Sequence, residues 1–311
     1  MVIDVVIPTY KPDERLLKTI DMLFKQSISV NRVVLMNTEE KYLDRLFRGR
    51  KFIDNYKRIS VKHVSAWEYD HGKTRNKGAD GSTADFILFM TQDAIPEDDK
   101  LIENLVKPFE DPMVASAYAR QIPSEDATLA EAFSREFNYP EESGVKSQAD
   151  LERLGIKTYF CSNACAMYRR EVYEKFGRFP AHMIFNEDMV FAHTVISNGY
   201  KIAYAAQARV IHSHNYTNRQ QYKRNFDLAV SQAMHPEVFG NVSSESEGLR
   251  YAKAAFVYFK DHKKAYLFIP FAFTCFYRLC GYRKGKKYEK MTHRQILKCT
   301  MSPKYFKKMW S

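Results

Sequence analysis

The sequence of 311 residues predicts an α/β protein built on a doubly wound, mainly parallel sheet. Two observations support this fold class. Short apolar runs of strand length alternate with segments whose apolar residues recur at helical spacing. The hydrophobic content of 45% also allows a substantial core, so one large domain with an appendage is the expected organisation.

The first third of the chain supplies four expected strands. Residues 2–8 form a buried-strand pattern, and the next segment places Leu16, Ile20, Leu23 and Phe24 on one helical face. Further strands are expected at residues 31–37, at residues 60–64 and in the run from residue 84 that ends at Asp93, with a short helix over 73–81. No Gly-x-Gly-x-x-Gly follows the first strand, so the sequence lacks a dinucleotide-binding fingerprint.

The remaining elements are less regular. Residues 123–154 are polar and acidic, and loops and helices over a site are expected there. Extended chain is expected at 159–168, 201–205 and 208–214, with a helix through Lys175 and another opening at Asn186. Gly, Ser and Glu accumulate between residues 240 and 249, which predicts a first domain at residues 1–240 and a second at 241–311.

Asp93 is the first candidate functional residue. It follows an apolar strand pattern as a lone carboxylate, and Pro96 prevents the strand from continuing unbroken. Ligands of open α/β sheets bind at the carboxyl ends of the strands, so Asp93 is placed to hold a charged group such as a metal-bound diphosphate. The alternative is that Asp93 only starts a turn or caps a helix.

A pair of acids and a pair of histidines are further candidate functional residues beside Asp93. Glu187 and Asp188 open a helical pattern, where they serve either a site or the helix dipole. His212 and His214 are two residues apart, so on a strand they would share a face as paired ligands do, although such pairs are also often inert. One shared site accounts for all of these residues together.

The positive charge is confined to the C-terminal region. The net charge is +11, yet Arg250–Ser311 contains 16 of the 48 basic residues and two of the 37 acidic ones. The preceding residues are therefore slightly acidic, which argues against nucleic acid as a partner. Five unevenly spread cysteines indicate neither a disulfide framework nor a zinc cluster, and no secretory signal is recognised, so a cytoplasmic location is expected.

The apolar, aromatic stretch 265–277 lies between lysine- and arginine-rich segments. It is shorter than the roughly 20 residues that span a bilayer. Basic anchors around aromatic residues favour a peripheral segment at the membrane interface. The alternatives are a buried C-terminal helix or a homodimer contact.

Several motifs occur in an order that resembles a known family. They are Val5–Tyr10, Asp70–Asn76 with the sequence DHGKTRN, Thr91–Ala94 with TQDA, Asn186–Asp188, and the segment around His212. Over residues 2–235 the chain resembles family 2 glycosyltransferases of the GT-A fold, and more narrowly bacterial rhamnosyltransferases that build cell-wall or surface polysaccharide. The resemblance implies a nucleotide-sugar half at about 1–120, an acceptor half at about 121–240, and a basic helical appendage.

The resemblance also implies roles for residues. Asp93 matches the last acid of the family's metal motif, with Thr91 in place of the first acid, and His212 and then His214 are the further candidate ligands of Mn²⁺ or Mg²⁺. Asp188 matches the base that activates the acceptor. The residues expected to bind the donor are Thr9, Tyr10, Asn37, Asp70, Lys73, Arg75, Asn76, Gln92 and Arg224.

The function expected from this resemblance is inverting transfer by a single displacement. The implied donor is dTDP-rhamnose, and the implied acceptor is a saccharide, lipid-linked if the C-terminal region binds the inner face of the plasma membrane. A UDP-hexose glycosyltransferase is the alternative. A sugar nucleotidyltransferase is a weaker one, because the expected Gly-rich phosphate loop is missing after the first strand.

Overall fold

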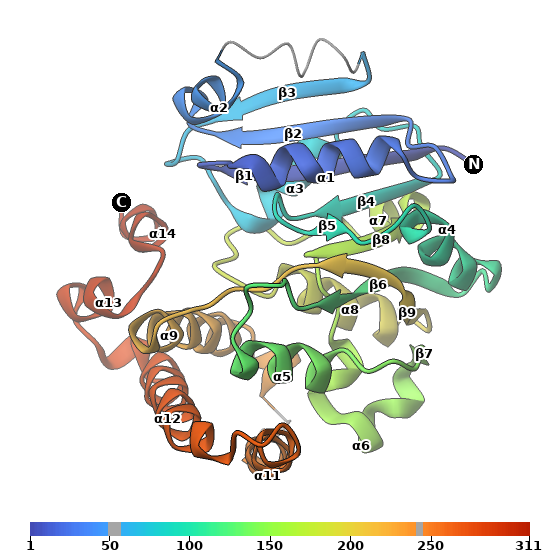
Figure 1. Cartoon of the computed structure of the whole chain (residues 1–311). Helices are drawn as coiled ribbons and strands as arrows, with labels where there is room; N and C mark the ends of the chain where they lie inside the picture. The colour runs from blue at the N-terminus through green and yellow to red at the C-terminus, as the bar shows by residue number, and fades with distance from the viewer. Residues whose placement is uncertain (49–56, 241–244) are drawn as a thin grey trace. The chain divides into compact units, whose positions relative to one another are not determined.

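The computed structural model describes residues 1–48, 57–240 and 245–311 (Figure 1). These residues form two compact units. The first contains residues from Met1–Ile122, Tyr139–His182 and Glu187–His212, and the second contains residues from Pro123–Asn138, Met183–Asn186 and Ser213–Ser311.

The first unit contains the whole sheet. Its strands are β1 (Ile3–Tyr10), β2 (Arg32–Thr38), β3 (Ile59–Val64), β4 (Phe86–Met90), β5 (Ile95–Pro96), β6 (Val114–Ile122), β7 (Gly144–Lys146), β8 (Cys165–Arg169) and β9 (Lys201–Ile211). Its helices are α1 (Glu14–Phe24), α2 (Glu40–Phe47), α3 (His71–Ala79), α4 (Leu101–Val106), α6 (Leu151–Leu154), α7 (Arg170–Lys175) and α8 (Glu187–Ser197), with short 3-10 helices η2 (Lys107–Glu110), η3 (Gln148–Asp150) and η4 (Gly155–Tyr159).

The strands are ordered β3-β2-β1-β4-β8-β6-β9-β5, and β7 also pairs with β9. β1 is parallel to β2 and β4, β2 is parallel to β3, and β6 is parallel to β9. β8 runs antiparallel to both β4 and β6, so β6 and β9 point in the same direction as β1 and β4. The sheet is therefore mixed but mostly parallel, as expected.

Helices pack on both faces of the sheet because successive strand residues point to opposite sides. On one face, Val5 of β1 shares a hydrophobic core with Leu16 and Ile20 of α1. On the other face, Gly78 of α3 approaches β1 so closely that an added Cβ would lie 2.4 Å from Cγ1 of Val6. This arrangement is the doubly wound architecture that the alternating pattern predicted (Figure 1).

Three expected strands differ from the observed ones. The extended segment expected at 159–168 is wrong in its first part, because the chain leaves η4 and enters β8 only at Cys165. The segments 201–205 and 208–214 are joined into one strand, β9, whose pairing with β6 shifts register between Ala119 and Arg120. β9 ends at Ile211, so His212 and His214 follow the strand instead of lying within it.

The second unit is helical. It contains α5 (Leu129–Asn138), α9 (Asn218–Met234), α10 (Pro236–Phe239), α11 (Glu245–Asp261), α12 (Phe268–Gly285), α13 (His293–Cys299) and α14 (Pro303–Met309), with 3-10 helices η5 (Ala265–Leu267) and η6 (Tyr288–Lys290). A capping box formed by Thr217 and Gln220 starts α9. Phe133, Phe259 and Phe271 form one apolar cluster of this unit.

The expected helical, basic C-terminal region is present as α11 to α14. The boundary expected at 240/241 borders residues 241–244, which lie outside the described residues. The compact units instead group residues 213–240 with the C-terminal helices. Within the described chain, every helix is too short or too polar to cross a membrane.

Candidate active site

The polar residues of interest in the first unit gather where strands end. Because β4, β6 and β9 point in the same direction, their carboxyl ends lie at one edge of the sheet, and the antiparallel β8 begins at that edge. Asp93 follows β4, His212 follows β9, and Asn163 precedes β8. The topology thus brings together side chains that are far apart in the sequence.

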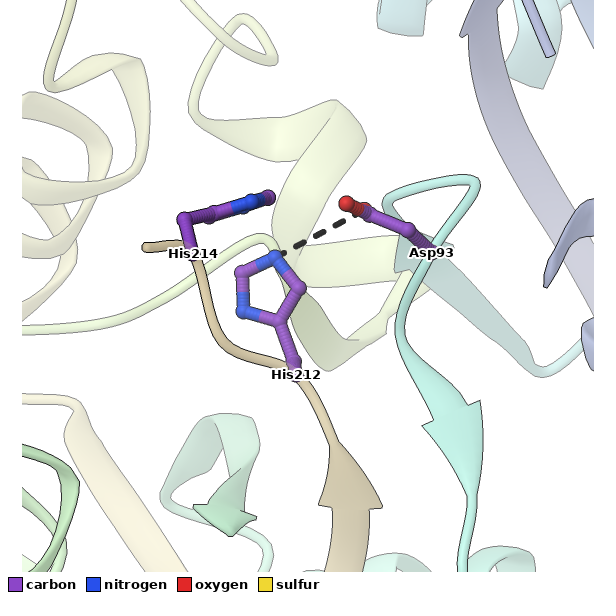
Figure 2. A group of neighbouring side chains, drawn as sticks. All are labelled: Asp93, His212 and His214. Atoms are coloured by element: carbon purple, nitrogen blue, oxygen red, sulfur yellow. Dashed lines mark ion pairs between the residues drawn. The ribbon is translucent and has the colours of Figure 1, made fainter. Parts of the chain in front are cut away.

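Asp93 and His212 are close neighbours in this arrangement. The Asp93 Oδ1 atom lies 3.6 Å from Nε2 of His212, and the two side chains are 12% and 10% exposed. His214 follows two residues later, and the three residues offer ligand atoms that all lie within 4.8 Å of one another (Figure 2). One carboxylate oxygen with two imidazole nitrogens is a donor set that suits Mn²⁺, and the carboxylate also suits Mg²⁺.

Two residues that the sequence analysis missed adjoin this cluster. Nδ1 of His212 lies 2.8 Å from Oε1 of the buried Gln121, at the end of β6. A guanidinium nitrogen of Arg15, on α1, lies 3.7 Å from Oδ2 of Asp93. Gln121 is a polar residue near the end of a mostly apolar strand, but nothing in the local sequence around Gln121 or Arg15 indicates which residue each one contacts.

Asp188 lies in the first turn of α8, and backbone groups hold its carboxylate. Its carboxylate accepts hydrogen bonds from the backbone N–H groups of Asn163, at 3.0 Å, and of Met189, at 2.9 Å. Asn163 also connects Asp188 to the strand that leads to Asp93, because the neighbouring Ala164 carbonyl accepts a hydrogen bond from the Thr91 N–H. The first unit therefore ties Asp188 to the loop that carries Asp93.

The electrostatic surroundings of Asp188 favour its protonated form. Burial raises the pKa of Asp188, and the charge of the adjacent Glu187 raises it further, to about 7. Burial alone would also raise the pKa of Glu187, but the positive charge of Arg75, 3.1 Å away, helps to keep that pKa lowered. Of the two adjacent acids, Glu187 therefore stays ionised while Asp188 can take up a proton near neutral pH.

The carboxyl ends of β1 and β2 carry further candidate residues. The Thr9 hydroxyl donates to Oδ1 of Asn37 at 3.1 Å, and both side chains are buried. Gln92 is hydrogen-bonded to both the backbone N–H and the carbonyl of Tyr10, at 2.9 and 3.1 Å. These contacts tie the loop after β4 to the end of β1, and Tyr10 is 48% exposed beside them.

Comparison with known proteins gives the site a family context. The sequence pattern described as glycosyl transferase family 2 matches residues 4–177. The chain is 39% identical to the O-antigen chain rhamnosyltransferase RfbN of Salmonella typhimurium over 94% of this chain and 91% of that protein. It is 43% identical to the O-antigen chain rhamnosyltransferase WbaN of Salmonella anatum over 73% of each chain.

The chain belongs to glycosyltransferase family 2. A solved structure agrees with the fold: the mannosyltransferase PcManGT from Pyrobaculum calidifontis, in complex with GDP-Man and Mn²⁺, superposes with a TM-score of 0.63 at 15% identity. That match covers 93% of this chain and 88% of the other, and it supports the expected GT-A architecture.

The DHGKTRN segment of this glycosyltransferase forms the start of α3. Asp70 caps the helix, its side chain accepting from the Lys73 N–H at 2.8 Å, while the Lys73 side chain is exposed. Arg75 is directed to Glu187. Asn76 is held by the Phe179 carbonyl at 2.8 Å. Asp70 and Lys73 remain candidate donor contacts, whereas the side chains of Arg75 and Asn76 contact other residues of the protein.

Gly72 explains how α3 approaches the residues before α8. A Cβ atom at Gly72 would lie 1.9 Å from the carbonyl oxygen of Pro180, so any larger residue would push the two segments apart. The glycine thereby permits the approach that accompanies the contact between Asn76 and Phe179.

Arg224, another expected donor contact, belongs to the second unit. It lies on α9, where its guanidinium stacks over the Phe185 ring at 4.6 Å and near the Tyr216 ring at 5.8 Å. Its neighbours within this unit are therefore aromatic.

Proposed function

We propose that this family 2 enzyme is a metal-dependent, inverting rhamnosyltransferase of surface polysaccharide synthesis. The observation that carries the proposal is the pair formed by Asp93 and His212 at the sheet edge to which Asp188 is also tied. The names of the two Salmonella relatives support rhamnose as the sugar. dTDP-rhamnose is the proposed donor, and a UDP-hexose is the alternative.

The metal-binding role is assigned to Asp93, His212 and His214. A bound Mn²⁺ or Mg²⁺ would supply positive charge that stabilises the leaving nucleoside diphosphate. The chemistry of the donor set supports this assignment, and the Mn²⁺ of the PcManGT complex agrees with it. Arg15 adds a second positive charge beside Asp93.

Asp188 is assigned as the general base. It would accept the proton of the acceptor hydroxyl as that oxygen attacks the sugar carbon. The backbone N–H groups of Asn163 and Met189 fix the direction of the carboxylate. A single base serves a single in-line displacement, and such a displacement inverts the anomeric centre.

The donor is assigned to the carboxyl ends of β1 and β2 and to the start of α3. Tyr10 is exposed and would contact the nucleoside, while Thr9 and Asn37, which are buried and bonded to each other, would support the strand ends beneath it, with Asp70 and Gln92 beside it. The exposed Lys73 is free to reach the diphosphate, and Arg224 is the proposed contact from α9. Arg75 contacts Glu187 and Asn76 contacts Phe179, so we assign these two residues to stabilising the site and not to direct contact with the donor.

A donor panel tests this function. The full-length enzyme is incubated with Mn²⁺ and either dTDP-rhamnose or one of several UDP-hexoses, and the released nucleoside diphosphate is measured. We expect release from dTDP-rhamnose, loss of most release in Asp188→Asn, and an unchanged thermal shift on donor binding in that variant. Release only from a UDP-hexose would replace the proposed donor, and full activity of Asp188→Asn would refute the base.

A lipid-linked acceptor at the inner face of the plasma membrane is the second part of the proposal. Ile269, Phe273 and Phe276 share one face of α12 and are 60–66% exposed. In the same unit, a groove of about 530 Å³ is lined by Ala252, Lys253, Phe256, Val257 and Phe268. Aromatic residues and lysines together suit the interface of anionic lipids.

Vesicle co-sedimentation tests the membrane contact. We expect the full-length protein to sediment with anionic vesicles and Phe273→Ser/Phe276→Ser to remain in solution. Met113→Ser is the matched control, because Met113 is an exposed apolar residue of the first unit. Equal sedimentation of the double variant and the parent would refute the contact, and loss of a dimer in the double variant would support the dimer alternative.

A further inference from the structure

We propose that Gln121 is a positioning residue that fixes the tautomer and the orientation of His212 for metal binding. The inference rests on the proposed metal site of Asp93, His212 and His214. The inference gives a role to Gln121, a residue outside the sequence motifs. It also predicts which nitrogen of His212 faces the metal.

Backbone pairing brings the two residues together. β6 and β9 are parallel, and Gln121 lies opposite Val210 in their register. The pairing continues one step beyond β9, where the His212 N–H donates to the carbonyl of Ile122 at 3.0 Å. His212 therefore leaves the sheet beside the end of β6, with its backbone held by the strand that carries Gln121.

The side chain of Gln121 is fixed by two hydroxyl groups. Its Nε2 donates to the Tyr139 hydroxyl at 2.6 Å and to the Ser162 hydroxyl at 2.9 Å. Gln121 is 3% exposed and Tyr139 is 6% exposed, so water does not compete freely for these bonds. With the amide nitrogen turned to the two hydroxyls, the amide oxygen is the atom that faces His212.

This orientation decides the tautomer of His212. An amide oxygen accepts hydrogen bonds but cannot donate them, so Nδ1 of His212, 2.8 Å away, carries the proton. In the neutral ring Nε2 then has a lone pair, and it lies 3.6 Å from Oδ1 of Asp93. A lone pair and a carboxylate oxygen directed at the same region bind a cation in common.

Hydrogen bonds to a metal-binding histidine set the expected effect of removing Gln121 on metal affinity. Partners that hold the second nitrogen of a ligating histidine commonly change metal affinity by about 10- to 100-fold when they are removed. Gln121 is the partner of His212 here, and Tyr139 and Ser162 hold Gln121 in turn. Loss of the Gln121 oxygen should therefore weaken metal binding, while a carboxylate in its place would still accept the Nδ1 proton.

The test measures Mn²⁺ binding to the full-length protein by calorimetry, without donor or acceptor. We expect Gln121→Leu to bind Mn²⁺ about 10- to 100-fold more weakly than the parent. Gln121→Glu should stay close to the parent because it keeps an acceptor oxygen, and His212→Ala should lose most binding. Thermal unfolding of each metal-free variant checks that the fold is retained.

The outcomes separate this inference from the proposed function. If His212→Ala binds Mn²⁺ like the parent, the metal assignment itself fails. If His212→Ala loses binding but a folded Gln121→Leu does not, the metal site stands and the role of Gln121 is refuted. Nitrogen-15 NMR of the metal-free parent provides a test without substitution, because a proton on Nε2 of neutral His212 would overturn the inference and one on Nδ1 would support it.

Discussion

At the scale of single residues, Asp188 and Glu187 show how surroundings separate two adjacent acids. Glu187 has a cationic partner in Arg75, whereas Asp188 relies on two backbone N–H groups and carries the repulsion of its neighbour. A base with a raised pKa holds a transferred proton more firmly than an ordinary aspartate. The arrangement therefore favours proton uptake at Asp188 over Glu187.

The raised pKa of Asp188 predicts the pH dependence of turnover. Only the ionised carboxylate can accept a proton, so kcat/KM should rise about tenfold per pH unit below the pKa and level off above about 7. The measurement is a pH profile between about 5 and 8 at saturating Mn²⁺, with Mn²⁺ binding followed separately because histidines titrate in the same range. A flat profile would contradict the base assignment, and the residual activity of Asp188→Asn should lack the rise.

Part of the site could be predicted from single residues. A carboxylate after a strand and two histidines near another strand predicted a common location, and Asp93 and His212 are indeed 3.6 Å apart. Gln121 and Arg15 could not be predicted in the same way, because their positions depend on the pairing of β6 with β9 and on the packing of α1. Such contacts follow from topology and have no local sequence pattern.

At the scale of elements, close approach of two helices holds the second unit together. Gly281 of α12 faces α9, and an added Cβ would lie 2.1 Å from the carbonyl oxygen of Tyr222. Alanine normally stabilises a helix interior by about 1 kcal/mol relative to glycine. At Gly281 the clash with the backbone should outweigh that gain.

Thermal unfolding tests this packing. Gly281→Ala should lower the Tm, whereas Gly248→Ala should leave it unchanged or raise it slightly, because Gly248 is an exposed residue of α11 with open space around its Cβ position. Each substitution adds one methyl group to a helix, so the difference between the two changes in Tm measures the effect of the contact between α9 and α12. An equal or higher Tm for Gly281→Ala would show that α9 and α12 are not packed this closely.

The elements themselves were predictable where one pattern dominated. β1, β2 and β4 are mostly apolar runs buried between helix layers, and their sequences show this directly. β5 and β7 are very short strands that pair with β9, so their sequences hold too few residues for any pattern. The sequence predicted two strands, at 201–205 and 208–214, where the structure has the single strand β9. The residues between the two predicted segments lie at the register shift, where the pairing of β9 with β6 is irregular.

At the scale of the whole molecule, charge is distributed unevenly along the chain. Residues 250–311 carry the whole excess of basic residues, and the preceding part is slightly acidic. Folding leaves large apolar side chains of α12, including Ile269 and Phe273, more than half exposed. An apolar face on a basic helical region is what attachment to an anionic surface requires.

This asymmetry predicts how salt affects the enzyme. Charges attract over about 10 Å at 0.1 M salt but only about 3 Å at 1 M. Raising the salt from the lower to the higher value should therefore release much of the protein from anionic vesicles and lower turnover of a vesicle-borne acceptor. Turnover of a water-soluble acceptor should fall far less, because Asp93, His212 and Asp188 are part-buried and less screened than the basic surface. The same enzyme preparation serves both assays. If salt lowers turnover of the vesicle-borne and the water-soluble acceptor equally, the salt effect arises in the active site, and the proposed role of the basic region in binding the acceptor's membrane is refuted.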